Sequence, residues 1–487
     1  MIPNVDYIRI LPEIVLAVFG MIVMVVDPLM DPERNVRPLG IIALIGSLAA
    51  VGATIYQMSF QGVAFWGMVR VDSFSIFFHL LVAVATVLVI LASFEYLEVQ
   101  RIRAGEYFGL ILLGAIGMDL MSSAVELVLI FIALEISSIS TYILAGFRQR
   151  DAGSTESSLK YFLLGSFATA FFLYGIALMF GATGSTSIPQ IAVTLNSQGV
   201  PTLAYVAFAL IFVGLGFKVA SAPFHVWTPD VYEGAPAPVV GFMSTAPKMA
   251  VFAVLLRILF ETEGPKLLAG SQPVWFWWVW VSAALSMTIG NLGALLQNNV
   301  KRLLAYSAIA HAGYLLIAFA AAPEAGISAA MFYAASYTAM NLGAFILVSH
   351  FANAGEKYVT LDDYTGLGRR SPGLAAVLTI FLISLIGIPA TAGFFAKFYV
   401  FSAALKANLV GLTIIAVINS AVGAYYYLRV IVVMYMRDSK ADIPVLKMRA
   451  GVLATLTISA LATIYLGILP SRVLEYATRS AQDLLVR

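Results

Sequence analysis

The chain has 487 residues, of which 61% are hydrophobic and 11% charged, whereas soluble proteins carry about 25% charged residues. The net charge of +2 gives no sign of a nucleic-acid partner, and without cysteine the chain cannot hold a disulfide or a thiolate-bound iron–sulfur cluster. Apolar stretches of about 18 residues or more recur along the sequence, which predicts an all-α polytopic membrane protein surrounded by a lipid bilayer.

Hydropathy predicts about fourteen membrane-spanning helices. In chain order they lie near residues 10–26, 38–57, 73–94, 106–122, 125–146, 158–181, 203–222, 240–260, 274–296, 302–321, 328–351, 373–405, 409–436 and 450–469. Fifteen lysines and arginines fall in the odd-numbered loops, against seven in the even-numbered loops and the termini. Because cytoplasmic loops are enriched in these residues, both termini are expected outside the cytoplasm.

Two of the predicted spans are interrupted, the seventh at Pro223 and the twelfth at Pro389–Gly393. A proline in mid-membrane removes a backbone hydrogen bond and breaks the helix, although a simple packing kink is an alternative. Paired breaks in corresponding positions indicate an inverted repeat around a transport site. The expected organisation is therefore helices 1–3 in residues 1–105, five-helix repeats in 106–272 and 273–437, and a last helix with a tail in 438–487.

Five charged residues lie in or at the edge of apolar stretches: Lys160, Lys218, Lys248, Lys397 and Glu135. A charge at the bilayer centre costs about 2.5–3.5 kcal/mol on insertion scales, so such groups are expected to face protein or water. An ammonium in apolar surroundings also releases its proton more readily than one in water. These residues therefore indicate proton movement across the membrane.

Glu135 is expected to be the counter-charge of Lys218, whose ammonium the freed carbonyls at the Pro223 break can solvate. Structural alternatives stay open: Glu135 can hydrogen-bond a neighbouring helix, and Lys248 or Lys397 can reach the interface by extending their side chains. Lys160 begins its span four residues after Glu156, as an interfacial helical ion pair would.

Histidines add two candidates for the proton path. His225 follows the first break directly, and a histidine there can titrate near neutrality. His311 lies in mid-span, where a hydrogen-bonded core histidine is an equal alternative. The other two, His79 and His350, are expected to be structural. No metal-ligand spacing, nucleotide-binding loop or nucleophile elbow is visible, so neither a metal nor a cofactor is expected in this chain.

The segment Ala222–Pro236, with the wording APFHVWTPDVYEGAP, resembles a signature of the antiporter-like membrane subunits of respiratory complex I. Within that family it is most similar to the N-type subunits. Further matching segments are Leu134–Glu135, Ser154–Phe162, Gly216–Lys218, Ala246–Lys248, Val300–Ser307 and Pro389–Phe398. They run from the fifth to the twelfth predicted span.

The resemblance implies a fourteen-helix core with two inverted five-helix repeats. It implies a proton path through Glu135, Lys218, Lys248 and an exit-side Lys397, with Lys160, His225 and His311 as possible further members. The chain would be a subunit of a proton-translocating NADH:quinone oxidoreductase, with subunits K and M among its neighbours, while NADH, FMN, iron–sulfur clusters and quinone bind other subunits. The alternatives are a subunit of a multisubunit cation/proton antiporter and a purely structural spacer.

Overall fold

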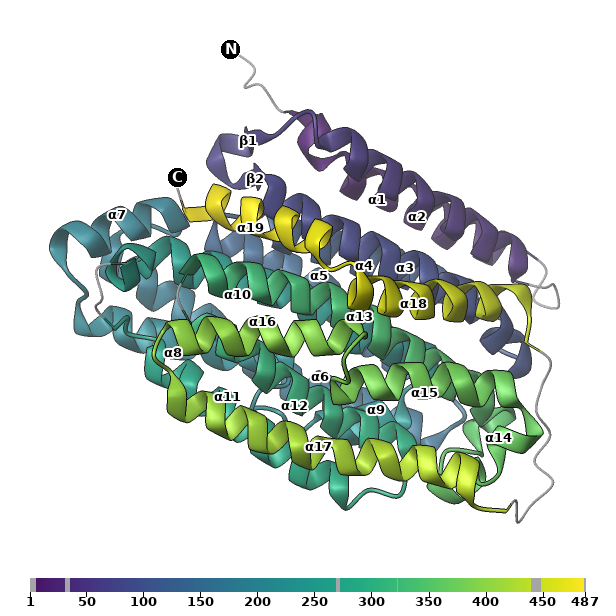
Figure 1. Ribbon diagram of the computed structural model, residues 1–487. Coiled ribbons are helices and arrows are strands. Elements are labelled where there is room, and N and C mark those ends of the chain that lie inside the picture. Colours follow the sequence, from purple (N-terminus) through teal and green to yellow (C-terminus); the bar gives the residue numbers. More distant parts are fainter. Residues whose placement is uncertain (1–5, 31–35, 269–271, 322, 439–447, 486–487) are drawn as a thin grey trace.

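The computed structural model describes residues 6–30, 36–268, 272–321, 323–438 and 448–485. It is a bundle of long helices with one small β-hairpin, formed by strands β1 (Gly62–Ala64) and β2 (Val69–Val71) (Figure 1). Twelve helices in these ranges are long and apolar enough to cross a membrane. The predicted all-α polytopic membrane fold is therefore confirmed.

The first half of the bundle comprises α1 (Leu11–Val26), α2 (Arg37–Gln57), α3 (Ser73–Val99), α4 (Glu106–Ser123), α5 (Leu127–Ala145), α6 (Ala152–Thr183), α8 (Thr202–Val219) and α10 (Ala237–Leu268). The second half comprises α11 (Phe276–Leu295), α12 (Val300–Ala320), α13 (Pro323–Ala352), α15 (Pro372–Ile386), α16 (Ala392–Lys406), α17 (Val410–Met436) and α18 (Ala450–Ile468). The predicted domain boundaries all fall between helices, while the inverted relation of the two five-helix groups stays a prediction.

Both predicted helix breaks are present. The helix α8 ends at Val219, with Ala220 in the left-handed region (φ 60°), and the chain resumes helical structure only in the short α9 (Thr228–Gly234). The helix α15 ends at Ile386, with Gly387 at φ 92°, and α16 begins at Ala392. The fourth and twelfth predicted spans correspond to α4 and to the α15–α16 pair, neither of which is among the twelve long apolar helices.

Shorter helical elements lie before, between and after the long helices. They are α7 (Ile188–Gln198), α14 (Leu367–Arg370), α19 (Ser471–Leu485) and the 3₁₀ turns η1 (Tyr7–Ile10), η2 (Asp27–Leu29), η3 (Phe65–Gly67), η4 (Ala354–Glu356) and η5 (Leu361–Tyr364). The expected C-terminal tail is thus partly helical. The helix α19 packs its buried Ala477, Ala481 and Leu484 against the bundle, and the hydroxyl of Tyr476 donates to the carbonyl of Ser73 at the start of α3.

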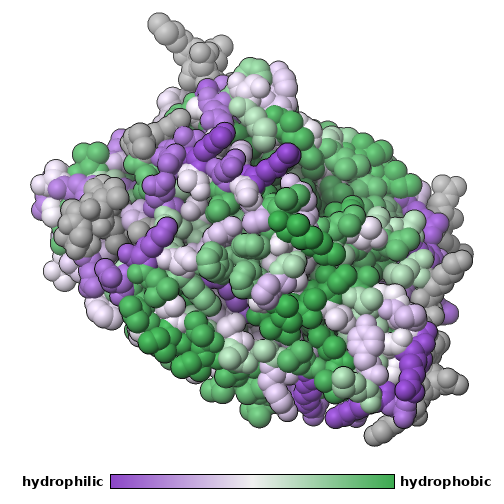
Figure 2. Space-filling view, in the orientation of Figure 1, coloured by the Kyte–Doolittle hydropathy of each residue, from purple (hydrophilic) through white to green (hydrophobic). Residues whose placement is uncertain are grey.

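The helices differ strongly in burial. The most apolar stretch of α10 is 100% buried and that of α12 is 94% buried, whereas those of α1 and α17 are only 28% and 33% buried. Figure 1 accordingly shows α10 and α13 in the middle of the bundle, between α1 and α2 on one edge and α11 and α17 on the other. Hydrophobic surface covers much of the middle of the molecule in Figure 2, with hydrophilic residues gathered toward the two ends. Lys248 and Arg257 on α10 and Lys301 on α12 therefore lie in protein, away from lipid.

Candidate functional site

The first buried lysine, Lys218, lies in the last turn of α8, beside the helix break. Its ammonium is 3.4 Å from the hydroxyls of both Tyr142 and Tyr161, to which it donates hydrogen bonds. It also lies 4.6 Å and 4.8 Å from the centres of these two rings, within the range of cation–π attraction. Two phenol side chains, from α5 and α6, therefore form the immediate surroundings of the Lys218 charge.

Glu135 occupies a different position from the one expected. It is half-buried on α5, in a stripe with the exposed Ile132 and Ile139, and its Oε1 atom is buried with no hydrogen-bond partner in the described part of the chain. No ion pair within 4 Å joins it to Lys218 among the described residues. The charge of Glu135 still acts on Lys218 through space. The two residues are electrostatic neighbours here and not a contact pair.

Lys248 lies at the centre of the bundle on α10, with 1% of its surface exposed. Its ammonium donates to the carbonyl of Ala308 at 3.5 Å and lies 5.7 Å from the ring centre of Tyr232. The Tyr232 hydroxyl is buried and has no hydrogen-bond partner among the described residues. Burial at this depth rules out the alternative that Lys248 extends its side chain to the interface.

Aromatic side chains fill the space between Lys218 and Lys248. The ring of Tyr161 stacks on Trp227 at 4.5 Å, and Trp227 meets the edge of Tyr232 at 5.9 Å. Sequence reasoning missed Tyr142, Tyr161 and Tyr232, because a tyrosine in an apolar stretch does not differ visibly from other aromatic packing residues.

His311, on α12, lies between Lys248 and Lys397. Its Nδ1 atom is 2.6 Å from the hydroxyl of Tyr333, and its Nε2 atom is 3.4 Å from the hydroxyl of Tyr427. A cavity of about 10 Å³ is lined by both Lys248 and His311, and space of about 10–15 Å³ is what one water molecule needs. A hydroxyl or water route can therefore join Lys248 to His311.

Lys397 is held at the second helix break. Its ammonium donates to the carbonyls of Leu385 at 3.2 Å and Ile386 at 2.8 Å, and to the hydroxyl of Ser420 at 2.9 Å. The helical partner of the Leu385 carbonyl would be the N–H of residue 389, which is a proline and has none. The lysine thus satisfies carbonyls that the break has freed.

The ammonium of Lys397 also lies 4.8 Å from the ring centre of Tyr314, whose ring is 5.7 Å from that of His311. The charges of Lys248 and Lys397 both act on His311. The structure therefore brings Lys218, Lys248, His311 and Lys397 into one row of buried basic groups separated by tyrosines.

The two other candidates lie outside this row. Lys160 is 39% exposed and forms ion pairs with Glu156 at 2.7 Å and Asp230 at 2.8 Å, as the interfacial alternative requires. His225 lies in the turn between α8 and α9, half-buried, and its Nδ1 atom has no hydrogen-bond partner in the described ranges.

A carboxylate that the sequence did not single out, Glu356 in η4, is buried near the start of α12. It forms an ion pair with Lys301 at 2.6 Å and accepts hydrogen bonds from Tyr96 at 2.7 Å and from the N–H of Ala237 at 2.8 Å. Burial raises the pKa of Glu356, but the charges of Lys301 and Arg148 outweigh it and hold that pKa below its ordinary value. Glu356 therefore stays ionised and ties α3, α10 and α12 together.

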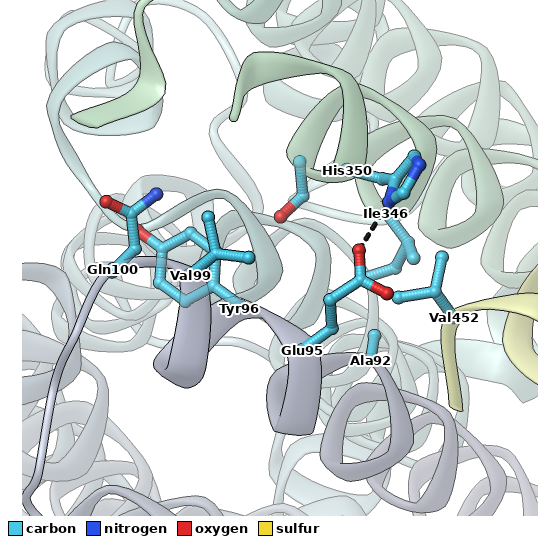
Figure 3. A pocket seen from close by; sticks show the side chains of 9 residues that line it. Ala92, Glu95, Tyr96, Val99, Gln100, Ile346, His350 and Val452 are labelled. Carbon is cyan, nitrogen blue, oxygen red and sulfur yellow. Dashed lines mark hydrogen bonds and ion pairs between the residues drawn. The ribbon is translucent and has the colours of Figure 1, made fainter. Parts of the chain in front are cut away.

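A second buried tie joins the first three helices to the second half of the chain. Glu95 of α3 contacts the Nδ1 atom of His350 on α13, and its other oxygen accepts the N–H of Arg449 at 2.8 Å. Figure 3 shows this pair, joined by a dashed line, among the residues that line a small pocket, with Val452 of α18 beside the carboxylate. The expected structural role of His350 agrees with this placement.

Comparison with known proteins places the chain in a family. Residues 124–463 match the family described as NADH:quinone oxidoreductase/Mrp antiporter, transmembrane. The chain is 65% identical to "NADH-quinone oxidoreductase subunit N 2" of Koribacter versatilis, over 99% of this chain and 98% of that one. A chain of respiratory complex I from Thermus thermophilus is 35% identical, with a TM-score of 0.82 over 96% of this chain and 99% of that one.

A chain of the Mrp complex from Dietzia sp. has a TM-score of 0.83, over 98% of this chain and 97% of that one, but only 19% identity, and so shows the fold alone. The residue-level similarity is thus to the quinone oxidoreductase relatives. The chain belongs to the NADH:quinone oxidoreductase/Mrp antiporter transmembrane family and, within it, to the subunit N group.

Proposed function

We propose that this chain moves protons across the membrane as an antiporter-like subunit of the membrane arm of complex I. The observation that carries the proposal is the row of Lys218, Lys248, His311 and Lys397, buried in protein and linked by tyrosine hydroxyls and rings. Family membership supports it, since the relatives are NADH-quinone oxidoreductase subunits. The subunit acts in a translocating oxidoreductase whose NADH, FMN, iron–sulfur clusters and quinone belong to other subunits.

The mechanism is electrostatic. The charge of Glu135 acts on Lys218 through space. A charge or conformational change in the neighbouring subunit alters that field, and Lys218 gives up its proton toward Lys248. The cavity beside Lys248 and the two tyrosine hydroxyls on His311 continue the route to Lys397.

The experiment is Lys248→Arg and Lys248→Ala in the assembled complex, measured as quinone reduction and proton translocation in sealed vesicles. Arginine stays protonated in proteins and alanine has no titratable group, so neither variant can relay a proton. Proton translocation should therefore fall about tenfold or more. Lys406→Ala, at the end of α16, is the matched control and should keep the wild-type rate. Wild-type pumping by Lys248→Arg would remove this lysine from the path.

A cation/proton antiporter subunit is the second candidate, because the family description covers both classes. It is less well supported, since the Mrp chain shares only 19% of its residues with this one. Proton translocation that requires NADH and quinone, and continues without added sodium or potassium, separates the two.

The proposed setting is a bacterial inner membrane, with both termini periplasmic and subunits K and M as neighbours. The basic bias of the odd-numbered loops supports this orientation. Arg150→Cys tests it, because the chain has no native cysteine and Arg150 is exposed, whereas the adjacent Asp151 caps α6. An impermeant thiol reagent should label this cysteine only in inverted vesicles, and labelling of intact spheroplasts would contradict the orientation.

A further inference from the structure

Two buried carboxyl groups lie outside the basic row and have no role in the proposed path. Glu13 on α1 is 4% exposed and Asp119 on α4 is fully buried. In the part of the chain that the structure describes, none of their four side-chain oxygens has a hydrogen-bond partner. Burying an ionised carboxylate without a partner is strongly unfavourable, so this pair needs a physical explanation.

The packing of α1 on α4 brings the two groups to the same level. These helices run antiparallel, with Gly20 against Leu112 and Met24 against Gly109. Glu13 lies seven residues before Gly20, and Asp119 lies seven residues after Leu112. The two side chains are therefore at the same level of the antiparallel pair. Glu13 also lies on the buried face of α1, together with Leu16, Gly20 and Val23, and its charge acts directly on Asp119.

One titratable group, His79 of α3, adjoins the pair. Its Nε2 atom is 3.0 Å from the backbone oxygen of Asp119, and its Nδ1 atom is 3.3 Å from the Oε1 atom of Gln57. The amide nitrogen of Gln57 donates to the carbonyl of Arg9 at 2.7 Å, which fixes its oxygen toward the histidine. A neutral imidazole has one N–H and can donate to only one of these two oxygens.

Three arginines at this end of the bundle already form ion pairs with other carboxylates. Arg257 contacts both Asp72 and Glu261, Arg70 contacts Glu261, and Arg9 contacts Asp6. These three arginines are therefore engaged with other carboxylates, and none of the described ion pairs includes Glu13 or Asp119.

Two carboxylates in one apolar site cannot both be ionised without a large electrostatic cost, and one proton held between them removes it. We propose that Glu13 and Asp119 hold a single shared proton, which makes them a proton-binding site separate from the basic row. The pair then carries one negative charge in place of two. The site lies near the start of α1 and the end of α4, at the end of the bundle that carries the β-hairpin and α19 (Figure 1).

The test is infrared spectroscopy of the intact purified complex at neutral pH, read at the carbonyl stretch of protonated carboxylic acids. A shared proton predicts that Glu13→Gln and Asp119→Asn each remove the band of one acid. With one partner an amide, the remaining carboxylate accepts its N–H and has no like charge beside it. The double variant should remove nothing more, and Glu475→Gln, a control at an exposed position on α19, should leave the band unchanged.

Three results overturn the proposal: loss of the band in only one single variant, two half-losses that add in the double variant, or no band from this site. If either amide variant fails to assemble, Glu13→Asp and Asp119→Glu keep an acid with altered reach. Both must then shift the same band, and a shift in only one of them also overturns the proposal. The experiment reads protonation alone, so its result is independent of whether Lys248 carries protons.

Discussion

The two helix breaks present their lysines with different surroundings. At the first break, the carbonyl of Phe217 accepts from the indole of Trp227 at 3.0 Å, and that of Ala222 accepts from Ser282 at 2.7 Å. Lys218 donates to neither of these carbonyls and lies against phenol rings and hydroxyls. At the second break, Lys397 itself supplies the donors for the free carbonyls.

This difference bears on how the direct partners at each break stabilise the charged form of its lysine. A hydrogen bond to a charged group contributes about 1.5–3 kcal/mol, whereas a cation–π contact contributes about 0.5–2 kcal/mol. The charged form of Lys397 thus has stronger partners than the charged form of Lys218, whose two hydrogen bonds are both 3.4 Å long.

The largest contrast is expected when each lysine becomes methionine. Lys397→Met leaves the carbonyls of Leu385 and Ile386 without donors, at a cost of about 1–3 kcal/mol each, so less complex should assemble. Lys218→Met places an apolar side chain among aromatic rings and should assemble normally. Both should lose proton translocation. Complex content on native gels and vesicle pumping measure the two effects, and equal assembly of both variants would erase the distinction between the breaks.

A smaller effect is expected from the hydroxyls around Lys218. Tyr142→Phe and Tyr161→Phe keep the rings but each removes one long hydrogen bond, worth about 0.5–1.5 kcal/mol. Pumping should fall about two- to tenfold in each single variant and further in the double variant, with assembly unchanged. Tyr174→Phe, at an exposed site on α6, is the control. A double variant that pumps at the wild-type rate would show that the rings alone define the first site.

The smallest effect concerns Glu135 and Lys218, which do not touch. In a double-mutant cycle of Glu135→Gln and Lys218→Met, the coupling energy for assembly should lie within about 0.5 kcal/mol of zero. The matched positive control is Glu356→Gln with Lys301→Met, because that pair is in contact at 2.6 Å and should couple strongly. Strong coupling between Glu135 and Lys218 would mean that they form a direct pair in the assembled complex.

The helices, both breaks and the buried lysines could be predicted because proline and charge are conspicuous in apolar stretches. What the lysines touch could not be predicted, because tyrosines from α5 and α6 reach Lys218 only through tertiary packing. Among the described contacts Lys218 donates to phenol hydroxyls, and it is Lys397 that donates to carbonyls freed by a break. Glu356 gave no signal, since it follows a loop glycine in a polar segment, and Asp119 lies too near the end of its span to be distinguished from an interfacial charge.

The burial of α10 has a consequence for biosynthesis. This helix carries Lys248 and Arg257 into the bundle, and inserting a charge that has no partner is unfavourable. Arg257 finds its carboxylate in Asp72, at the start of a helix synthesised much earlier. Stable integration of α10 into the bilayer therefore depends on α3 already being in place. We expect the nascent chain to keep α3 close to the translocon until α10 has been inserted.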